Sequence, residues 1–95
     1  MNVLHTQSRS PADSDALELM LRTLTPGDGV LLMQDAVIAA TLPHWQQVLA
    51  GRPCYALRED LEARGLISRV RVPIEVVDYD KFVQLTLEFE KVQAW

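Results

Sequence analysis

The apolar positions change their spacing several times along the chain, and each change predicts a switch between strand and helix. The segment 3–6 is a short strand candidate, and the polar stretch 10–14 predicts a turn that leads into a helix. In this helix, four apolar residues follow the spacing that places them on one face: Leu17, Met20, Leu21 and Leu24. The continuous apolar run 30–33 then predicts a strand that is covered on both faces.

The middle of the chain predicts short elements that are separated by proline and glycine. A short helical piece is expected over 36–40, and a further helix over 43–49, whose first residue is a proline, as first helical turns permit. The apolar segment 54–57 predicts another strand. A short helix is expected over 59–64, because Gly65 then supplies a helix stop.

The last third of the chain predicts a strand, a helix and a docked terminus. The strand is expected over 72–77, with Pro73 near its start, where proline is tolerated. Asp78 or Asp80 can cap the helix that follows. The apolar surface of this helix is broad and consists of Phe82, Val83, Leu85, Leu87 and Phe89, with Thr86 among them. The large aromatic side chain of Trp95 predicts that the end of the chain packs against the domain.

Alternating strands and helices predict one α/β domain over residues 1–95. We expect a mainly parallel sheet of four to five strands with helices on both faces, because parallel strands are joined by crossover helices. The length of 95 residues fits a single domain. The composition, 48% hydrophobic and 23% charged, is that of an ordinary globular protein and argues against disorder.

Charge and cysteine content narrow the classes of function. The net charge is −4 and the basic residues are scattered, so the chain lacks the cationic surface that binds nucleic acid or an anionic membrane directly. A single cysteine, Cys54, permits neither an internal disulfide nor a cysteine-rich zinc site. The sequence has no secretory signal and no apolar run of about 20 residues, as a membrane span requires. We therefore expect a protein of the reducing cytoplasm.

The ends of the predicted strands are where an open parallel sheet places its ligands. The polar residues at these ends are His5, Thr6, Gln34, Asp35, Arg58 and Asp78. Asp35 and Asp78 also stand where a helix needs an N-cap, and we favour that structural role for both. The glycines Gly27 and Gly29 precede a strand, at the wrong edge of the sheet for a phosphate-binding loop.

Neither histidine nor cysteine forms a recognisable catalytic or metal-binding motif. His5 is interpreted as a hydrogen-bonded structural group and His44 as a surface residue, and no spacing suggests a metal or another cofactor. Cys54 opens an apolar strand, so we expect it to be buried and inert, since reactive cysteines need exposure or a nearby cation. Met20 is expected to fill the core.

Several segments, in order along the chain, resemble the TusB/DsrH family of sulfur-relay proteins. They are Leu4-His5-Thr6 with Ser10-Pro11, Leu31-Leu32-Met33-Gln34-Asp35-Ala36-Val37, Tyr55-Ala56-Leu57, Asp60-Leu61-x-Ala63-Arg64-Gly65, Val77-Asp78-Tyr79-x-x-Phe82-Val83-x-Leu85-Thr86 and Gln93-Ala94-Trp95. Each segment is a weak match, and their joint order and spacing carry the resemblance. The resemblance covers the whole chain, and the length of the chain also fits the family.

The resemblance implies one subunit of a hetero-oligomeric complex of the TusBCD or DsrEFH type. The partners would be TusC/DsrF-like and TusD/DsrE-like subunits in a heterohexamer that passes sulfur as a cysteine persulfide, with no cofactor. In the Tus branch the sulfur reaches the 2-thiouridine of tRNA wobble positions, and in the Dsr branch the complex serves cytoplasmic sulfur oxidation. Some DsrH-type members carry a cysteine where this chain has Met20, and a thioether cannot form a persulfide.

The resemblance therefore predicts a non-catalytic subunit, and it mildly favours the Tus branch. We expect the contacts with partners to involve Asp35, Asp78, Phe82 and Trp95. Two other hypotheses about the function stay open. One is an independent sulfurtransferase that uses Cys54 as its nucleophile. The other is a small-molecule binding domain with its site near Asp35 and Asp78.

Overall fold

A five-stranded, fully parallel sheet forms the centre of the molecule, and its strand order is β4-β3-β2-β1-β5. The computed structural model describes residues 2–71 and 73–95. The strands are β1 (Val3–Gln7), β2 (Gly29–Leu32), β3 (Cys54–Leu57), β4 (Glu75–Val77) and β5 (Lys91–Ala94). The prediction of a single α/β layer with a parallel sheet is confirmed, and the number of strands is five.

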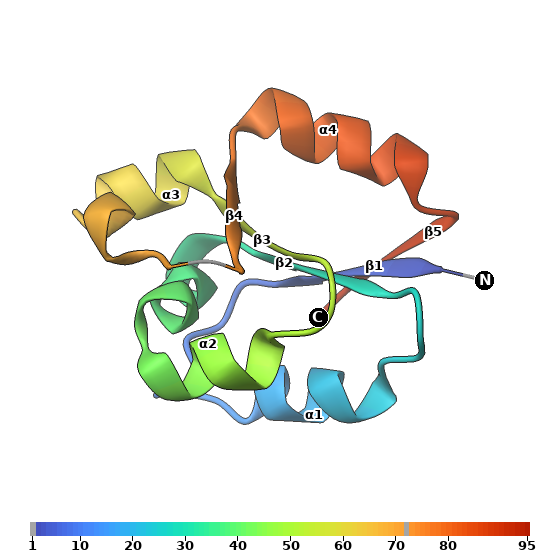
Figure 1. Ribbon diagram of the computed structural model, residues 1–95, viewed down its shortest axis with the longest axis horizontal. Coiled ribbons are helices and arrows are strands. Elements are labelled where there is room, and N and C mark those ends of the chain that lie inside the picture. Colours follow the sequence, from blue (N-terminus) through green and yellow to red (C-terminus); the bar gives the residue numbers. More distant parts are fainter. Residues whose placement is uncertain (1, 72) are drawn as a thin grey trace.

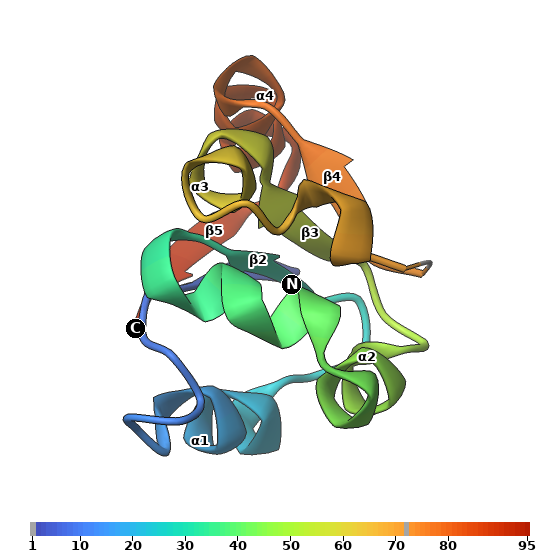
Figure 2. The ribbon, with the colours of Figure 1, turned by 90° about the vertical axis from the view of Figure 1, so that its left-hand side faces the viewer.

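Helices cover both faces of the sheet (Figure 1). They are α1 (Ala16–Thr23), the 3₁₀ helix η1 (Gln34–Thr41), α2 (Pro43–Leu49), α3 (Arg58–Ala63), the 3₁₀ turn η2 (Ile67–Arg69) and α4 (Tyr79–Glu88). The view in Figure 2 shows α1 and α2 on one side of the sheet and α4 on the other. Since β4 and β5 are the two edge strands, α4 has to cross the whole sheet between them.

Alternation along the strands divides the apolar core into two layers. Val30 and Leu32 of β2 belong to the larger core, which lies under α1, η1 and α2. Leu31, between them in sequence, faces the opposite side and packs in the smaller core with Leu4 and with Leu85 of α4. All four residues of β2 are buried, which explains why this strand lacks the alternating pattern of a half-exposed strand.

Most element boundaries agree with the sequence pattern, and the differences have local causes. The helix at 43–49 and the strand at 54–57 lie where they are predicted. The predicted strand 72–77 is too long, because β4 begins only at Glu75. Pro73 lies in a turn rather than at a strand position, and Val72 is outside the described residues. The predicted helical piece over 36–40 is present as part of the 3₁₀ helix η1.

The last strand, β5, is an element that the hydrophobic pattern does not indicate. It pairs in parallel with β1, and all of its residues are exposed. The backbone N–H of Trp95 continues the ladder by donating to the carbonyl of Thr6 at 3.0 Å. The predicted docking of Trp95 is therefore confirmed, and it occurs through a strand at the edge of the sheet.

Glycine is required at the start of β2 by the close approach of an aromatic ring. A Cβ atom on Gly29 would lie 2.7 Å from Cζ of Phe89. Phe89 ends α4 and packs on the smaller core, so this contact fixes where the crossover helix stops above the sheet. Gly29 thus couples the position of β2 to the end of α4.

We predict that Gly29→Ala destabilises the domain by about 1–3 kcal/mol, the usual cost of overpacking a well-filled contact. Urea unfolding followed by circular dichroism measures the loss. On a Phe89→Leu background, where the ring is gone, the same substitution is expected to cost less. Equal costs on both backgrounds would show that the ring is not the cause.

Candidate functional site

The loop that follows β2 has an unusual backbone conformation at the carboxyl edge of the sheet. Gln34 has a φ of 50°, and it is the one non-glycine residue with positive φ in segments 2–71 and 73–95. Its backbone N–H donates to Oδ2 of Asp60, at 2.6 Å. Non-glycine residues hold this conformation when their surroundings impose it, and such positions gather at functional sites. Asp60 supplies that constraint here.

A guanidinium joins the loop to α3. Nη2 of Arg64 donates to Oδ1 of Asp35 at 2.9 Å, and Nη1 of Arg64 donates to the carbonyl oxygen of Asp60 at 3.1 Å. The Asp35 side chain remains 70% exposed and that of Arg64 34% exposed. An exposed pair of this kind contributes about 0–1 kcal/mol, so its effect is to orient the loop more than to stabilise the fold.

These charges border a shallow hollow with a volume of about 400 Å³, rather than a deep cleft. The lining residues are Ser10, Asp13, Asp35, Ile38, Arg64 and Leu66. The lining contains no thiol and no imidazole, so it offers no pair of nucleophile and base. An exposed carboxylate beside a guanidinium can instead hold a polar group of a ligand or of another protein.

The two aspartates that the sequence singles out have different roles. Asp78 caps α4, because its Oδ1 accepts from the backbone N–H of Lys81 at 2.8 Å, as predicted. Asp35 does not cap η1, so its predicted capping role is wrong. Met33 occupies the cap position without a side-chain hydrogen bond, and Asp35 lies in the first turn, where it pairs with Arg64.

A largely buried chain of hydrogen bonds, which no sequence pattern indicates, holds Trp95 in place. Nε1–H of Trp95 donates to Nδ1 of His5 at 3.0 Å, and Nε2 of His5 lies 3.0 Å from Oδ2 of Asp28. Because an indole nitrogen only donates, Nδ1 must accept, and the proton of His5 therefore sits on Nε2 and points to Asp28. His5 is buried and hydrogen-bonded, as predicted, but it lies inside β1 rather than at its end.

Asp28 forms hydrogen bonds with three residues, two in β1 and one in the turn that follows α1. Besides His5, it accepts from the backbone N–H of Val3 at 2.9 Å and of Thr25 at 3.1 Å. Burial alone would raise the pKa of this carboxyl group, but the hydrogen bonds from Thr25, His5 and Val3 outweigh burial and hold the pKa below its ordinary value of 3.8. The only sequence sign of this role is an aspartate in the turn just before β2.

A second missed residue is Gln7, at the end of β1. It is fully buried, and its Oε1 accepts from the backbone N–H groups of Ser8 and Arg9 at 3.1 and 3.0 Å. Its Nε2 has no partner among the described residues. Gln7 thus shapes the start of the loop that leads to Ser10 in the hollow.

The remaining predicted contact residues are mostly internal. Phe82 is half-buried and packs against the smaller core, and its ring meets Tyr79 edge-on with centroids 5.8 Å apart. Trp95 is half-buried against the larger core. Their predicted part in subunit contacts stays a prediction.

Cys54 lies far from the hollow in the architecture, since it is the first residue of β3, at the amino edge of the sheet. It is 3% exposed, and burial raises the pKa of its thiol to about 12, although the charge of Arg52 acts in the opposite direction. A thiol with this pKa is almost never a thiolate at neutral pH. The predicted burial of Cys54 is confirmed, and so is that of Met20, which is completely enclosed in the core.

No group of three or more histidine, cysteine, aspartate or glutamate residues is placed to hold a metal ion in residues 2–71 and 73–95. His44 is exposed on α2, as predicted, and packs edge-on against Trp45. No helix in the described part of the chain has the length and apolar character to cross a bilayer.

Comparison with known proteins shows the family. The family described as "DsrH like protein" matches residues 9–92. Protein TusB of Pectobacterium parmentieri is 41% identical over 98 residues, and Protein TusB of Shigella dysenteriae serotype 1 is 44% identical over 96 residues. Both alignments cover 98% of this chain and 100% of the relative. The chain therefore belongs to the DsrH/TusB family of sulfur-relay proteins.

Solved structures share the same architecture. The crystal structure of the YchN protein from Escherichia coli superposes with a TM-score of 0.84 at 20% identity, covering 100% of this chain and 99% of that one. Protein Tm0979 from Thermotoga maritima gives a TM-score of 0.69, also at 20% identity, with 93% of each chain covered. At these identities the likeness shows the fold alone.

We predict that acid weakens the Asp28 hydrogen bonds. A carboxyl group with a lowered pKa in the folded state stabilises the fold above its unfolded pKa, and this contribution is lost as the pH falls through the folded value. Asp28→Asn should therefore cost about 1–3 kcal/mol at pH 7, the usual penalty for a broken buried hydrogen-bond set. Urea unfolding at pH 7 and near pH 3 should show the gap between wild type and variant shrinking in acid.

The control for this comparison is Asp13→Asn, which changes an exposed carboxylate and should leave stability nearly unchanged at both pH values. A gap between wild type and Asp28→Asn that is the same in acid as at pH 7 would contradict the assigned hydrogen bonds.

A second prediction concerns the reactivity of Cys54. With a pKa of about 12, only about one thiol in ten thousand is ionised at pH 8, and the folded chain also shields it. Iodoacetamide should therefore modify the native protein slowly and the urea-unfolded protein fast, as followed by intact mass. Rapid stoichiometric labelling of the folded chain would show an accessible, activated thiol.

Proposed function

We propose that this chain is the non-catalytic subunit of a cytoplasmic sulfurtransferase complex. In this proposal it assembles with TusC/DsrF-like and TusD/DsrE-like subunits into a heterohexamer. The complex relays persulfide sulfur for the 2-thiolation of the tRNA wobble uridine. A partner subunit supplies the reactive cysteine, and this chain helps to shape the site around it.

The observation that carries the proposal is the state of the single thiol. A persulfide forms when a thiolate attacks a sulfur donor, so the carrier must ionise and must be reachable. Cys54 is 3% exposed with a pKa of about 12, and it lies at the edge of the sheet opposite the hollow. A member of a sulfur-relay family with such a thiol needs a neighbour to carry the sulfur.

The carboxyl edge supports a role in contacts. The backbone of Gln34 is held in a left-handed conformation by Asp60, and Arg64 holds Asp35 in place with most of its carboxylate still exposed. A loop that is ordered before binding loses less entropy when a partner docks on it. This edge is therefore suited to order a cysteine-bearing loop of a neighbouring subunit.

Support for the Tus branch comes from the relatives. The similar curated proteins that cover the full chain carry the name Protein TusB. Some DsrH-type members carry a cysteine at the position of Met20. In this chain that position holds a thioether, which is enclosed in the core and cannot carry sulfur as a persulfide. The second candidate is a DsrH-type subunit in sulfur oxidation, which would share the same contacts.

Co-expression tests the proposal. With its C- and D-type partners the chain should purify as one complex of defined mass, and Asp35→Lys should weaken that complex because it reverses the charge at the ordered loop. Glu62→Lys is the matched control, since it makes the same charge change at an exposed residue of α3 that does not line the hollow. A chain that stays alone in the presence of both partners would contradict the proposal.

Sulfur loading provides the second arm. After incubation of the complex with a sulfur donor, mass spectrometry should find the added sulfur on a partner, and Cys54→Ala should transfer sulfur at the wild-type rate. A persulfide on Cys54 that transfers its sulfur to an acceptor in the absence of any other subunit would contradict the proposal. It would make the chain an independent sulfurtransferase.

A further inference from the structure

The outer side of α4 carries an apolar ridge, which we define as Tyr79, Val83 and Leu87. Their spacing of four residues aligns them along one side of the helix. They are 58%, 43% and 81% exposed, so no described part of the chain covers them. Only Leu85 of this helix is fully buried. A row of apolar side chains left open to water on a helix is typical of a surface that contacts another protein.

Acidic residues run along one border of the ridge. Asp80 and Glu88 each follow a ridge residue by one position, as does Gln84, so all three lie on the same flank of the helix. In the described structure neither Asp80 nor Glu88 is part of an ion pair. The half-buried Lys81 lies on the other side of the acidic border, towards the sheet. The ridge is therefore an apolar strip with an unpaired negative edge.

The opposite face of the molecule has a groove with the complementary pattern. It lies between α1 and α2 and has a volume of about 420 Å³. Its lining residues are Glu18, Leu21, Arg22, His44, Trp45, Val48 and Arg52. The apolar members form a floor with an indole, the side chain that most often dominates the energy of protein contacts.

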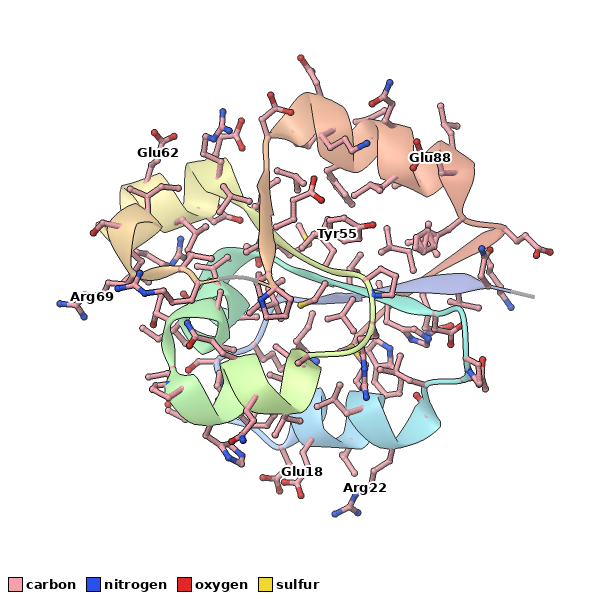
Figure 3. The ribbon with its side chains drawn as sticks, viewed as in Figure 1. Glu18, Arg22, Tyr55, Glu62, Arg69 and Glu88 are labelled. Carbon is pink, nitrogen blue, oxygen red and sulfur yellow. The ribbon has the colours of Figure 1, made fainter. Side chains whose placement is uncertain are left out.

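The charge of this groove is positive on balance, in a chain whose net charge is −4. Two guanidinium groups face one carboxylate, and His44 adds a further donor. Nη2 of Arg22 contacts Oε1 of Glu18 at 3.2 Å, but these side chains are 70% and 57% exposed, so the pair is weak and open to exchange. Figure 3 shows Glu18 and Arg22 projecting on one side of the molecule and Glu88 on the opposite side.

We propose that the ridge of one copy of this chain docks into the groove of a second copy. Tyr79 and Leu87 would pack on Trp45 and its apolar neighbours, while Asp80 and Glu88 face the arginines of the groove. Because ridge and groove lie on opposite faces, the contact is head-to-tail and each copy keeps a free ridge and a free groove. Association therefore continues past a dimer, into a ring or a longer stack.

This inference is independent of the proposed function, since both surfaces belong to the same chain. A single helix on a shallow groove buries less than about 1,200 Å², the range of weak contacts. The association is thus expected to require high protein concentrations and to weaken in salt, because the charges are exposed.

Sedimentation velocity of the full chain over a wide range of concentration tests the contact. The weight-average mass should rise beyond that of a dimer. Leu87→Ser should lower the association constant about tenfold or more, because it removes an apolar contact of the ridge. The variant should still fold, since Leu87 is 81% exposed and does not belong to the core. A chain that remains a monomer throughout, or a mass that levels off at the dimer, would overturn the proposal.

Complementary charge reversals identify the two surfaces. Arg22→Glu in the groove, or Asp80→Lys with Glu88→Lys on the ridge, should each abolish association, and mixing these two variants should restore it. The restoration follows because both contacts then pair opposite charges. Arg69→Glu and Glu62→Lys, exposed residues near α3 (Figure 3), make matched charge changes and should leave association unaltered. Failure of the mixture to associate would rule out this pairing of surfaces.

Discussion

The buried carboxylate of Asp28 is the contact on which the arrangement of the chain ends depends. It accepts from the backbone of Val3 at the start of β1, from the backbone of Thr25 in the turn after α1, and from His5. His5 in turn receives the indole N–H of Trp95. One side chain thus links both ends of the chain to the centre of the sheet. An exposed edge strand of four residues, such as β5, gains its place from this anchor as well as from its ladder with β1.

The position of β5 decides how the second face of the sheet is covered. Since β4 and β5 are opposite edge strands, the connection between them must run across β3, β2 and β1. One helix, α4, makes this crossing and packs on the smaller core through Leu85 and Phe82. The other face is covered by several helical segments, whereas this face has a single one. The outer side of α4 therefore exposes apolar residues to water. This surface is free for contact with another protein chain.

The single thiol and the candidate contact site lie at opposite edges of the sheet. Cys54 lies at the amino edge of the sheet, enclosed by the larger core, and its high pKa keeps it protonated. The carboxyl edge carries the ordered loop, the Asp35–Arg64 pair and the hollow. A sulfur-relay protein built in this way has its polar surface at one edge and its only thiol at the other. In the proposed function, this separation leaves a neighbouring subunit to supply the reactive cysteine.

Local patterns in the sequence determined the elements whose causes are local. The run at 30–33, the proline-led helix over 43–49 and the cap by Asp78 depend on residues within a few positions of one another, and they could be read directly. The tertiary structure alone decided the rest. His5 and Trp95 are 90 positions apart, and β5 is stabilised by pairing with β1, which no periodicity within 91–94 records. Asp35 likewise looked like a cap in sequence, because its partner Arg64 lies 29 residues away and meets it only when α3 packs beside η1.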